Sequence, residues 1–201
     1  MDSARHSAWL FDLDGTLYRP LPLKLAMAAE VLLFGRSALA SIRAFREEHE
    51  ALREENGTYE PSPYQEQLKR ASARLGIDGE QLESTVVEWV QKRPCRWLPR
   101  FARGGLIHEL REFRKAGGKT AVVSDYPGSR KLAALGLTGD FDEVVCNGET
   151  EGLRRLKPAP DGYRLAAERL GVAPEACLVL GDREDADGDA ARAAGMAFRK
   201  I

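Results

Sequence analysis

Two aspartates follow the first apolar run of the chain, at positions 12 and 14. The run, residues 8–11, is short and apolar throughout, as expected of a strand buried in a parallel sheet. An extended segment would place the carboxylates of Asp12 and Asp14 on the same side. There, one carboxylate can attack a phosphorus atom while the other handles the proton of the leaving group. A single Asp-x-Asp is common by chance, and taken alone it indicates only the cap of a turn or helix.

A hydroxyl group follows a second apolar run, residues 120–123, where Ser124 precedes Asp125. Ser124 could donate a hydrogen bond to a phosphoryl oxygen. Taken alone, it is better explained as an ordinary serine of a strand end or turn. Its position after a strand makes Ser124 a candidate binding residue, because ligands of open parallel sheets bind beyond the carboxyl ends of the strands.

Lys157 lies shortly before a predicted helix, and Pro158 restricts it to an extended conformation. Its ammonium group could neutralise a carboxylate nucleophile and the phosphoryl group under attack. A solvated loop lysine is the alternative for an isolated Lys-Pro, and Arg154 and Arg155 are competing cations nearby. We prefer Lys157 because of its defined place after the third apolar run.

An acidic cluster follows a fourth apolar run, residues 177–180, and contains Asp182, Asp185, Asp187 and Asp189. Magnesium prefers hard oxygen ligands and keeps several waters, so Asp182 together with Asp12 would make a suitable site. A solvated loop and a calcium loop are the alternatives. The calcium loop is disfavoured because the terminal Glu is missing and because a strand, not a helix, leads into the cluster.

Short apolar runs and helical patterns alternate after about residue 104, which is typical of an α/β fold with a doubly wound parallel sheet. The predicted strands are residues 8–11, 120–123, 143–146, 177–180 and 196–198. The first two are too far apart for one crossover helix. Between them we predict four helices, at residues 23–34, 37–55, 63–75 and 80–92, which would form a small all-helical domain. The predicted domains are therefore a core of residues 1–20 and 94–201 and a helical insertion of residues 21–93.

The bulk composition is that of a globular protein, with 201 residues, 43% of them hydrophobic and 30% charged. The net charge of −1 provides no global field for nucleic acid or an anionic membrane, so neither partner is expected.

Three cysteines without metal-ligand spacing disfavour a zinc site or disulfides and favour a reducing cytoplasm. We find no export signal. The apolar stretch of residues 21–34 is shorter than the roughly 20 residues of a membrane span, and a buried helix is expected there.

The four motifs together resemble those of the haloacid dehalogenase superfamily. The matching segments are Asp12-Leu13-Asp14-Gly15-Thr16, Ser124, Lys157-Pro158 and Gly181-Asp182 with the acids that follow. The resemblance extends from Trp9 to Phe198. It implies a Rossmann-like catalytic core, and the helical insertion resembles the cap that this superfamily carries after its first motif.

The resemblance also implies roles for the acids. Asp12 would attack phosphorus and form an aspartyl-phosphate, while Asp14 would protonate the leaving alcohol and then activate water. The cofactor would be Mg²⁺, bound by the Asp12 carboxylate, the Asp14 backbone carbonyl and the Asp182 carboxylate. Asp187, with Asp185 as the other candidate, would orient the metal's waters.

Ser124 and Lys157 would bind the phosphoryl oxygens. The expected function is thus Mg²⁺-dependent hydrolysis of a small phosphorylated metabolite. Dehalogenase members lack an acid at the position of Asp14, so this chain resembles the phosphatase and phosphomutase branches. A phosphomutase is the alternative, and a non-catalytic binding protein of the same fold is a lesser one.

The substrate and the oligomeric state do not follow from the sequence. Lys24, Arg36 and Arg43 are basic candidates for contacts between the cap and a substrate. The chain's histidines fall in no motif and are expected to be packing or surface residues; they are His6, His49 and His108.

Overall fold

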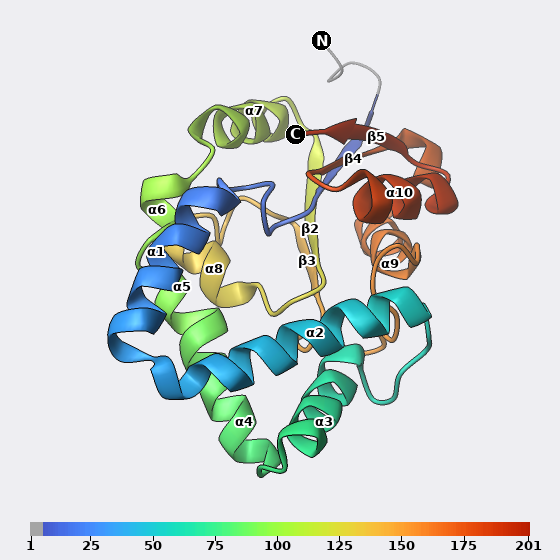
Figure 1. Ribbon diagram of the computed structural model, residues 1–201. Coiled ribbons are helices and arrows are strands. Elements are labelled where there is room, and N and C mark those ends of the chain that lie inside the picture. The colour runs from blue at the N-terminus through green and yellow to red at the C-terminus, as the bar shows by residue number, and fades with distance from the viewer. Residues whose placement is uncertain (1–5) are drawn as a thin grey trace.

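Five parallel strands form a single sheet in the order β3-β2-β1-β4-β5 (Figure 1). The computed structural model describes residues 6–201. The strands are β1 (Ala8–Phe11), β2 (Lys119–Ser124), β3 (Glu143–Cys146), β4 (Cys177–Gly181) and β5 (Ala197–Lys200). The α/β fold with a parallel sheet is therefore confirmed. The fifth strand begins one residue later than predicted and is only partly buried, as an edge strand can be.

The register of the central strands aligns their carboxyl ends. Phe11 of β1 pairs with Val122 of β2 on one side and with Leu180 of β4 on the other. Each strand therefore ends within one or two residues of the same line across the sheet. This alignment brings the segments that begin at Asp12 and Asp182 to one edge.

Helices cover both faces of the sheet, because the side chains of a strand alternate between its faces. Trp9 and Phe11 pack with the helices α7 (Gly104–Lys115) and α8 (Ser129–Ala134). Ala8 and Leu10 face the other way and pack with α9 (Asp161–Leu170) and α10 (Asp189–Ala194). The strands are apolar on both sides for this reason.

The segment between β1 and β2 is helical, as predicted. Its long helices are α1 (Pro20–Phe34), α2 (Leu39–Glu55), α3 (Pro63–Leu75) and α4 (Gly79–Val86). Shorter helical segments lie between or after them, namely η2 (Arg36–Ala38), η3 (Val87–Lys92), α5 (Arg93–Cys95) and α6 (Leu98–Phe101). The helix predicted at residues 80–92 is thus α4 continued by the π-helical turn η3. In Figure 1, α2 runs across the molecule between the sheet and the pair α3 and α4.

The chain segments that enter and leave this helical segment lie side by side and are joined by a short antiparallel bridge. Tyr18 and Ala102 form an antiparallel bridge, and Arg103 donates its backbone N–H to the Leu17 carbonyl at 2.9 Å. The entry lies close to the predicted start of the cap at residue 21. The domain boundaries at residues 21 and 93 stay a prediction.

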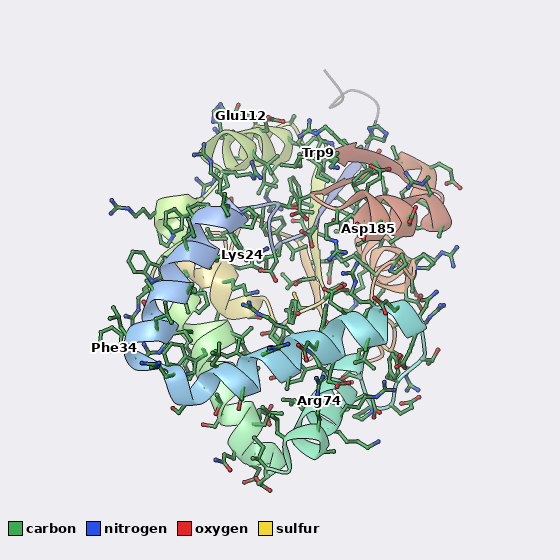
Figure 2. The ribbon with its side chains drawn as sticks, viewed as in Figure 1. Trp9, Lys24, Phe34, Arg74, Glu112 and Asp185 are labelled. Carbon is green, nitrogen blue, oxygen red and sulfur yellow. The ribbon has the colours of Figure 1, made fainter. Side chains whose placement is uncertain are left out.

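The prediction that residues 21–34 form a buried helix is wrong. The helix α1 forms, but only Leu23 and Glu30 are buried in it. Leu33 and Phe34 are each 73% exposed, and Figure 2 shows Phe34 at the outer edge of the molecule. One face of the helix packs on the core and on α5 and α6, and the rest of the apolar residues face outward. No single helix in residues 6–201 has the length and hydropathy of a membrane span, whereas α1 and the following helix meet that criterion as a pair bent by 110°.

Candidate active site

A pocket of about 100 Å³ lies between the carboxyl edge of the sheet and helix α2. The sheet side contributes all six residues that the sequence motifs single out. They are Asp12, Asp14, Ser124, Lys157, Asp182 and Asp187. Helix α2 contributes His49, Glu50 and Arg53 from the other side. The pocket is therefore closed jointly by the core and by the helical segment.

Asp12 belongs to a buried chain of ion pairs that is centred on Lys157. The Lys157 ammonium is 2.6 Å from Asp12 Oδ1 and 2.7 Å from Asp187 Oδ1. Tyr163 donates its hydroxyl to the same Asp187 oxygen at 2.9 Å, and Thr16 donates to Asp12 Oδ2 at 2.8 Å. Two aspartates thus hold one lysine at the end of β1, and Tyr163 holds one of these aspartates.

Burial, opposed by the attraction of Lys157 and assisted by the neighbouring Asp187, raises the pKa of Asp12 to about 7. Burial also disfavours the charged form of Lys157, but the surrounding acids outweigh it and hold the pKa of this lysine above its usual range. A cation beside Asp12 is therefore needed to keep the carboxylate ionised at neutral pH. Lys157 supplies one, and an adjacent metal ion would supply another.

Asp14 lies beside Asp12 but has a different set of partners. The Lys131 ammonium on α8 is 2.6 Å from each carboxylate oxygen of Asp14, and the Tyr18 hydroxyl donates to Oδ1. Burial works against ionisation of Asp14. The Lys131 charge and the two sets of hydrogen bonds outweigh it, so the pKa of Asp14 lies below its usual value. Asp14 is therefore ionised in this geometry.

Three carboxylates lie close enough to hold one metal ion. An oxygen of each of Asp12, Asp182 and Asp187 falls within 4.8 Å of the other two. No side chain among residues 6–201 donates a hydrogen bond to Asp182, so its half-buried oxygens are open to a ligand. Gly15 makes room for them, because a Cβ at this position would overlap the Asp182 carboxylate. The φ of Gly15 is +102°, a backbone conformation that also favours glycine. This set of hard oxygen donors fits Mg²⁺.

The structure separates the two acids that the sequence left open. Asp187 is buried, and its second oxygen accepts the backbone N–H of Arg183 at 3.2 Å. Asp185 is 67% exposed in its side chain and forms an ion pair with the Arg183 guanidinium outside the cluster. Asp187 thus belongs to the site by position, and Asp185 does not. The other oxygen of Asp187 contacts Lys157 and Tyr163, so this acid orients the lysine directly.

Ser124 is almost completely buried at the end of β2. Its Oγ accepts the backbone N–H of Tyr126 at 3.1 Å, which turns the chain and places the Tyr126 ring beside the pocket. The hydroxyl hydrogen of Ser124 remains available to a phosphoryl oxygen.

Several residues of the site escaped the sequence motifs, namely Lys131, which pairs with Asp14, and His49 and Arg53, which line the pocket. Lys131 follows Ser124 by seven residues with no pattern that marks it. His49 and Arg53 had a signal, since residues four apart share one face of a helix, but the sequence does not show which face meets the core. Lys24, Arg36 and Arg43 are exposed and do not line the pocket.

Comparisons with known proteins agree with this geometry. The family model of the haloacid dehalogenase-like hydrolases matches residues 6–195. The glyceraldehyde 3-phosphate phosphatase of Methanopyrus kandleri is 31% identical, over 96% of this chain and 83% of the relative. The 5-amino-6-(5-phospho-D-ribitylamino)uracil phosphatase of Escherichia coli is 29% identical, over 96% of this chain and 82% of the relative.

Solved structures share the fold. The L-2-haloacid dehalogenase of Xanthobacter autotrophicus superposes with a TM-score of 0.66 and 22% identity, over 98% of this chain and 77% of that protein. A HAD-hydrolase of Bacillus subtilis, whose structure holds magnesium, gives a TM-score of 0.64 and 19% identity, over 98% and 89% of the two chains.

The chain therefore belongs to the haloacid dehalogenase-like hydrolases. Its curated relatives over nearly the whole length are phosphatases, and within this family the chain is a phosphatase.

Proposed function

We propose that this protein hydrolyses the phosphate monoester of a small metabolite with the help of Mg²⁺ and through an aspartyl-phosphate on Asp12. The observation that carries the proposal is the environment of Asp12. Its carboxylate is buried at the end of the central strand, contacts Lys157, and has the open Asp182 carboxylate beside it. A buried carboxylate that is paired with a lysine and adjoins an acidic cluster suited to a divalent cation fits attack on an anionic phosphorus centre.

In the first step, a carboxylate oxygen of Asp12 forms a bond to phosphorus as the bond from phosphorus to the ester oxygen breaks. Lys157 neutralises the phosphoryl oxygens, and Ser124 donates a hydrogen bond to one of them. In the second step, water attacks the phosphorus of the aspartyl-phosphate, Asp14 accepts a proton of that water, and Asp12 and inorganic phosphate are released.

The Asp12 and Asp182 carboxylates and the Asp14 backbone carbonyl would hold the magnesium ion. When bound, Mg²⁺ supplies positive charge that offsets the repulsion between an anionic nucleophile and a phosphate dianion. The Bacillus subtilis structure with magnesium supports this part of the proposal.

Asp14 suits the second step as it stands, because Lys131 holds it ionised as a base. To protonate the leaving alcohol in the first step, Asp14 must first gain a proton and loosen its pair with Lys131. A substrate phosphate that arrives as the monoanion carries such a proton. Lys131 therefore sets the protonation state that Asp14 has before a substrate binds.

The test is release of inorganic phosphate from a panel of phosphate monoesters with Mg²⁺, with Asp12→Asn as the control. We expect metal-dependent release that falls by about a thousandfold or more in the variant. Equal release by both proteins would contradict the proposal. An isomerised sugar phosphate without release of phosphate would identify a phosphomutase instead. The phosphatase names of the relatives favour hydrolysis, and a cytoplasmic location stays a prediction.

A further inference from the structure

His49 is a buried histidine of α2 that borders the active-site pocket. Its ring is 3% exposed and stacks on Tyr126, with ring centroids 4.2 Å apart and planes at 18°. Tyr126 belongs to the loop that follows Ser124, so the contact joins the helical segment to the core. One face of the imidazole is thereby covered, and His49 lines the pocket.

The partner of Nδ1 determines where the His49 proton lies. Gln67 donates its side-chain Nε2 to the Phe45 carbonyl at 2.6 Å. The other end of the Gln67 amide, Oε1, therefore faces His49 Nδ1 at 3.3 Å as an acceptor. Turning the amide over would put two oxygens 2.6 Å apart, which excludes that orientation. Nδ1 must then carry the hydrogen.

The remaining nitrogen, Nε2, carries a lone pair. Burial lowers the pKa of His49 to about 4, so the ring is neutral near pH 7. No residue in the described part of the chain, 6–201, makes a hydrogen bond with Nε2. Nε2 is not among the fully buried unpartnered atoms of residues 6–201, so solvent reaches it from the pocket that His49 lines. A bound molecule that displaces this solvent must offer a donor of its own, because the acceptor would otherwise be left unpaired.

The two arginines that line the pocket, Arg53 of α2 and Arg183 after β4, are already paired with acids. Arg53 donates Nε to the Lys157 carbonyl at 3.2 Å and forms an ion pair with Glu50 at 3.0 Å. Arg183 pairs with Asp185 at 2.6 Å and lies 3.7 Å from Glu50. Each of the two arginines thus has an acid within ion-pair distance. A second anionic group on the substrate would have to displace one of these acids, whereas a hydroxyl group would not.

We propose that His49 is a specificity-determining residue whose Nε2 accepts a hydrogen bond from a hydroxyl group of the leaving alcohol. Polyol and sugar phosphates are then preferred over alkyl phosphates and over phosphorylated carboxylates. This inference rests on the proposed phosphatase function.

The test compares esters matched in chain length, namely glycerol 3-phosphate with propyl phosphate and ribitol 5-phosphate with pentyl phosphate. The wild-type protein is expected to prefer the hydroxylated ester in kcat/KM by about tenfold or more. In His49→Phe, which keeps an aromatic ring on Tyr126, this preference is expected to fall to about one. His108→Phe makes the same substitution on the exposed side of α7 and should keep the wild-type preference.

The variant His49→Phe leaves Gln67 Oε1 without a donor, so the double variant His49→Phe/Gln67→Leu is the second test protein. It removes the stranded amide and should show the same loss of preference. A preference retained in both variants would overturn the proposal, and so would a wild-type preference for propyl phosphate or 3-phosphoglycerate. If the proposal on His49 fails in this way, the proposed phosphatase function is tested separately. It holds if the wild type releases phosphate from 4-nitrophenyl phosphate and Asp12→Asn does not.

A spectroscopic measurement does not depend on the variants. In ¹⁵N NMR of histidine-labelled protein, three side chains contribute, and His6 and His108 can be assigned by substitution. We expect His49 to show a protonated Nδ1 and an unprotonated Nε2, and the Nε2 signal to shift when ribitol 5-phosphate binds to the Asp12→Asn protein. A protonated Nε2, or a signal that does not move at saturating ligand, would overturn the proposal.

Discussion

The Lys131 ammonium lies 2.6 Å from both carboxylate oxygens of Asp14, although 117 residues separate the two in the sequence. The pair joins the loop after β1 to α8, the helix after β2. Lys131 is 5% exposed, so water does not compete with the contact. The general acid and base of the proposed reaction is thus held by a residue outside the four motifs.

Lys131→Met is expected to lower kcat by about tenfold, because Asp14 loses the contact that orients its carboxylate. Steady-state kinetics in the presence of Mg²⁺ measures this loss. In an Asp14→Asn background the same substitution should have little further effect, since Lys131 acts through Asp14. Equal losses in both backgrounds would show that Lys131 acts in some other way.

Asp182→Asn is expected to raise the Mg²⁺ concentration for half-maximal activity by about tenfold or more, because an amide oxygen is a weaker ligand for Mg²⁺ than a carboxylate. A titration of activity against Mg²⁺ measures this half-maximal concentration. Asp185→Asn is the matched control, since this acid is exposed and outside the cluster. A shift of the same size in both variants would speak against Asp182 as a ligand.

Gly15→Ala should have a similar effect on the metal and should also lower stability. The added methyl group would overlap the Asp182 carboxylate, and the backbone at φ +102° disfavours a side chain. The Mg²⁺ titration and thermal unfolding measure the two effects. At Gly139 an added Cβ has open space, so Gly139→Ala is the control and should leave the Mg²⁺ requirement unchanged. An unchanged Mg²⁺ requirement in Gly15→Ala would be inconsistent with this account.

Asp187→Asn is expected to lower the free energy of unfolding by roughly 2 kcal/mol, because it removes one of the two aspartates that contact the buried Lys157 ammonium. Urea unfolding measures the change. Asp185→Asn should change the same quantity by no more than about 0.5 kcal/mol, as expected of an exposed ion pair. The two substitutions therefore distinguish the buried acid from its exposed neighbour, and equal effects would count against the distinction.

His49 should make the protein less stable in mild acid. An unfolded chain takes up a proton at this residue near pH 6.5, whereas burial holds the pKa at about 4 in the folded protein. Between these values the unfolded state binds more protons. The contribution of His49 to the free energy of unfolding is therefore fully present above about pH 6.5. It falls as the pH drops, by up to about 1.4 kcal/mol per pH unit.

The difference in unfolding free energy between pH 7.5 and pH 5 should thus be about 2 kcal/mol larger for the wild type than for His49→Phe. Urea titrations at the two pH values measure it. His108→Phe should behave as the wild type does. If the wild type and His49→Phe show the same pH dependence, His49 is not held neutral by burial.

The parallel type of the sheet could be predicted because short runs that are apolar on both sides suit only strands covered on both faces. Parallel strands present their carboxyl ends at one edge, which is why residues as distant as Asp12 and Lys157 could be expected together. The predicted burial of helix α1 was wrong for a related reason. Its apolar composition indicated burial, but exposure depends on whether a partner lies opposite each face.

The sequence by itself determined the parallel α/β fold and the inserted helices, and it predicted that one edge of the sheet gathers Asp12, Asp14, Ser124, Lys157 and Asp182. Each of these depends on local pattern and on the common direction of the strands. Only the tertiary structure decided that Lys131 pairs with Asp14, that Asp187 and not Asp185 joins the cluster, and that His49 borders the pocket. These contacts depend on the directions of side chains from elements far apart in the chain, and on the face that α2 turns toward the core. Neither is encoded in the spacing of residues within one element.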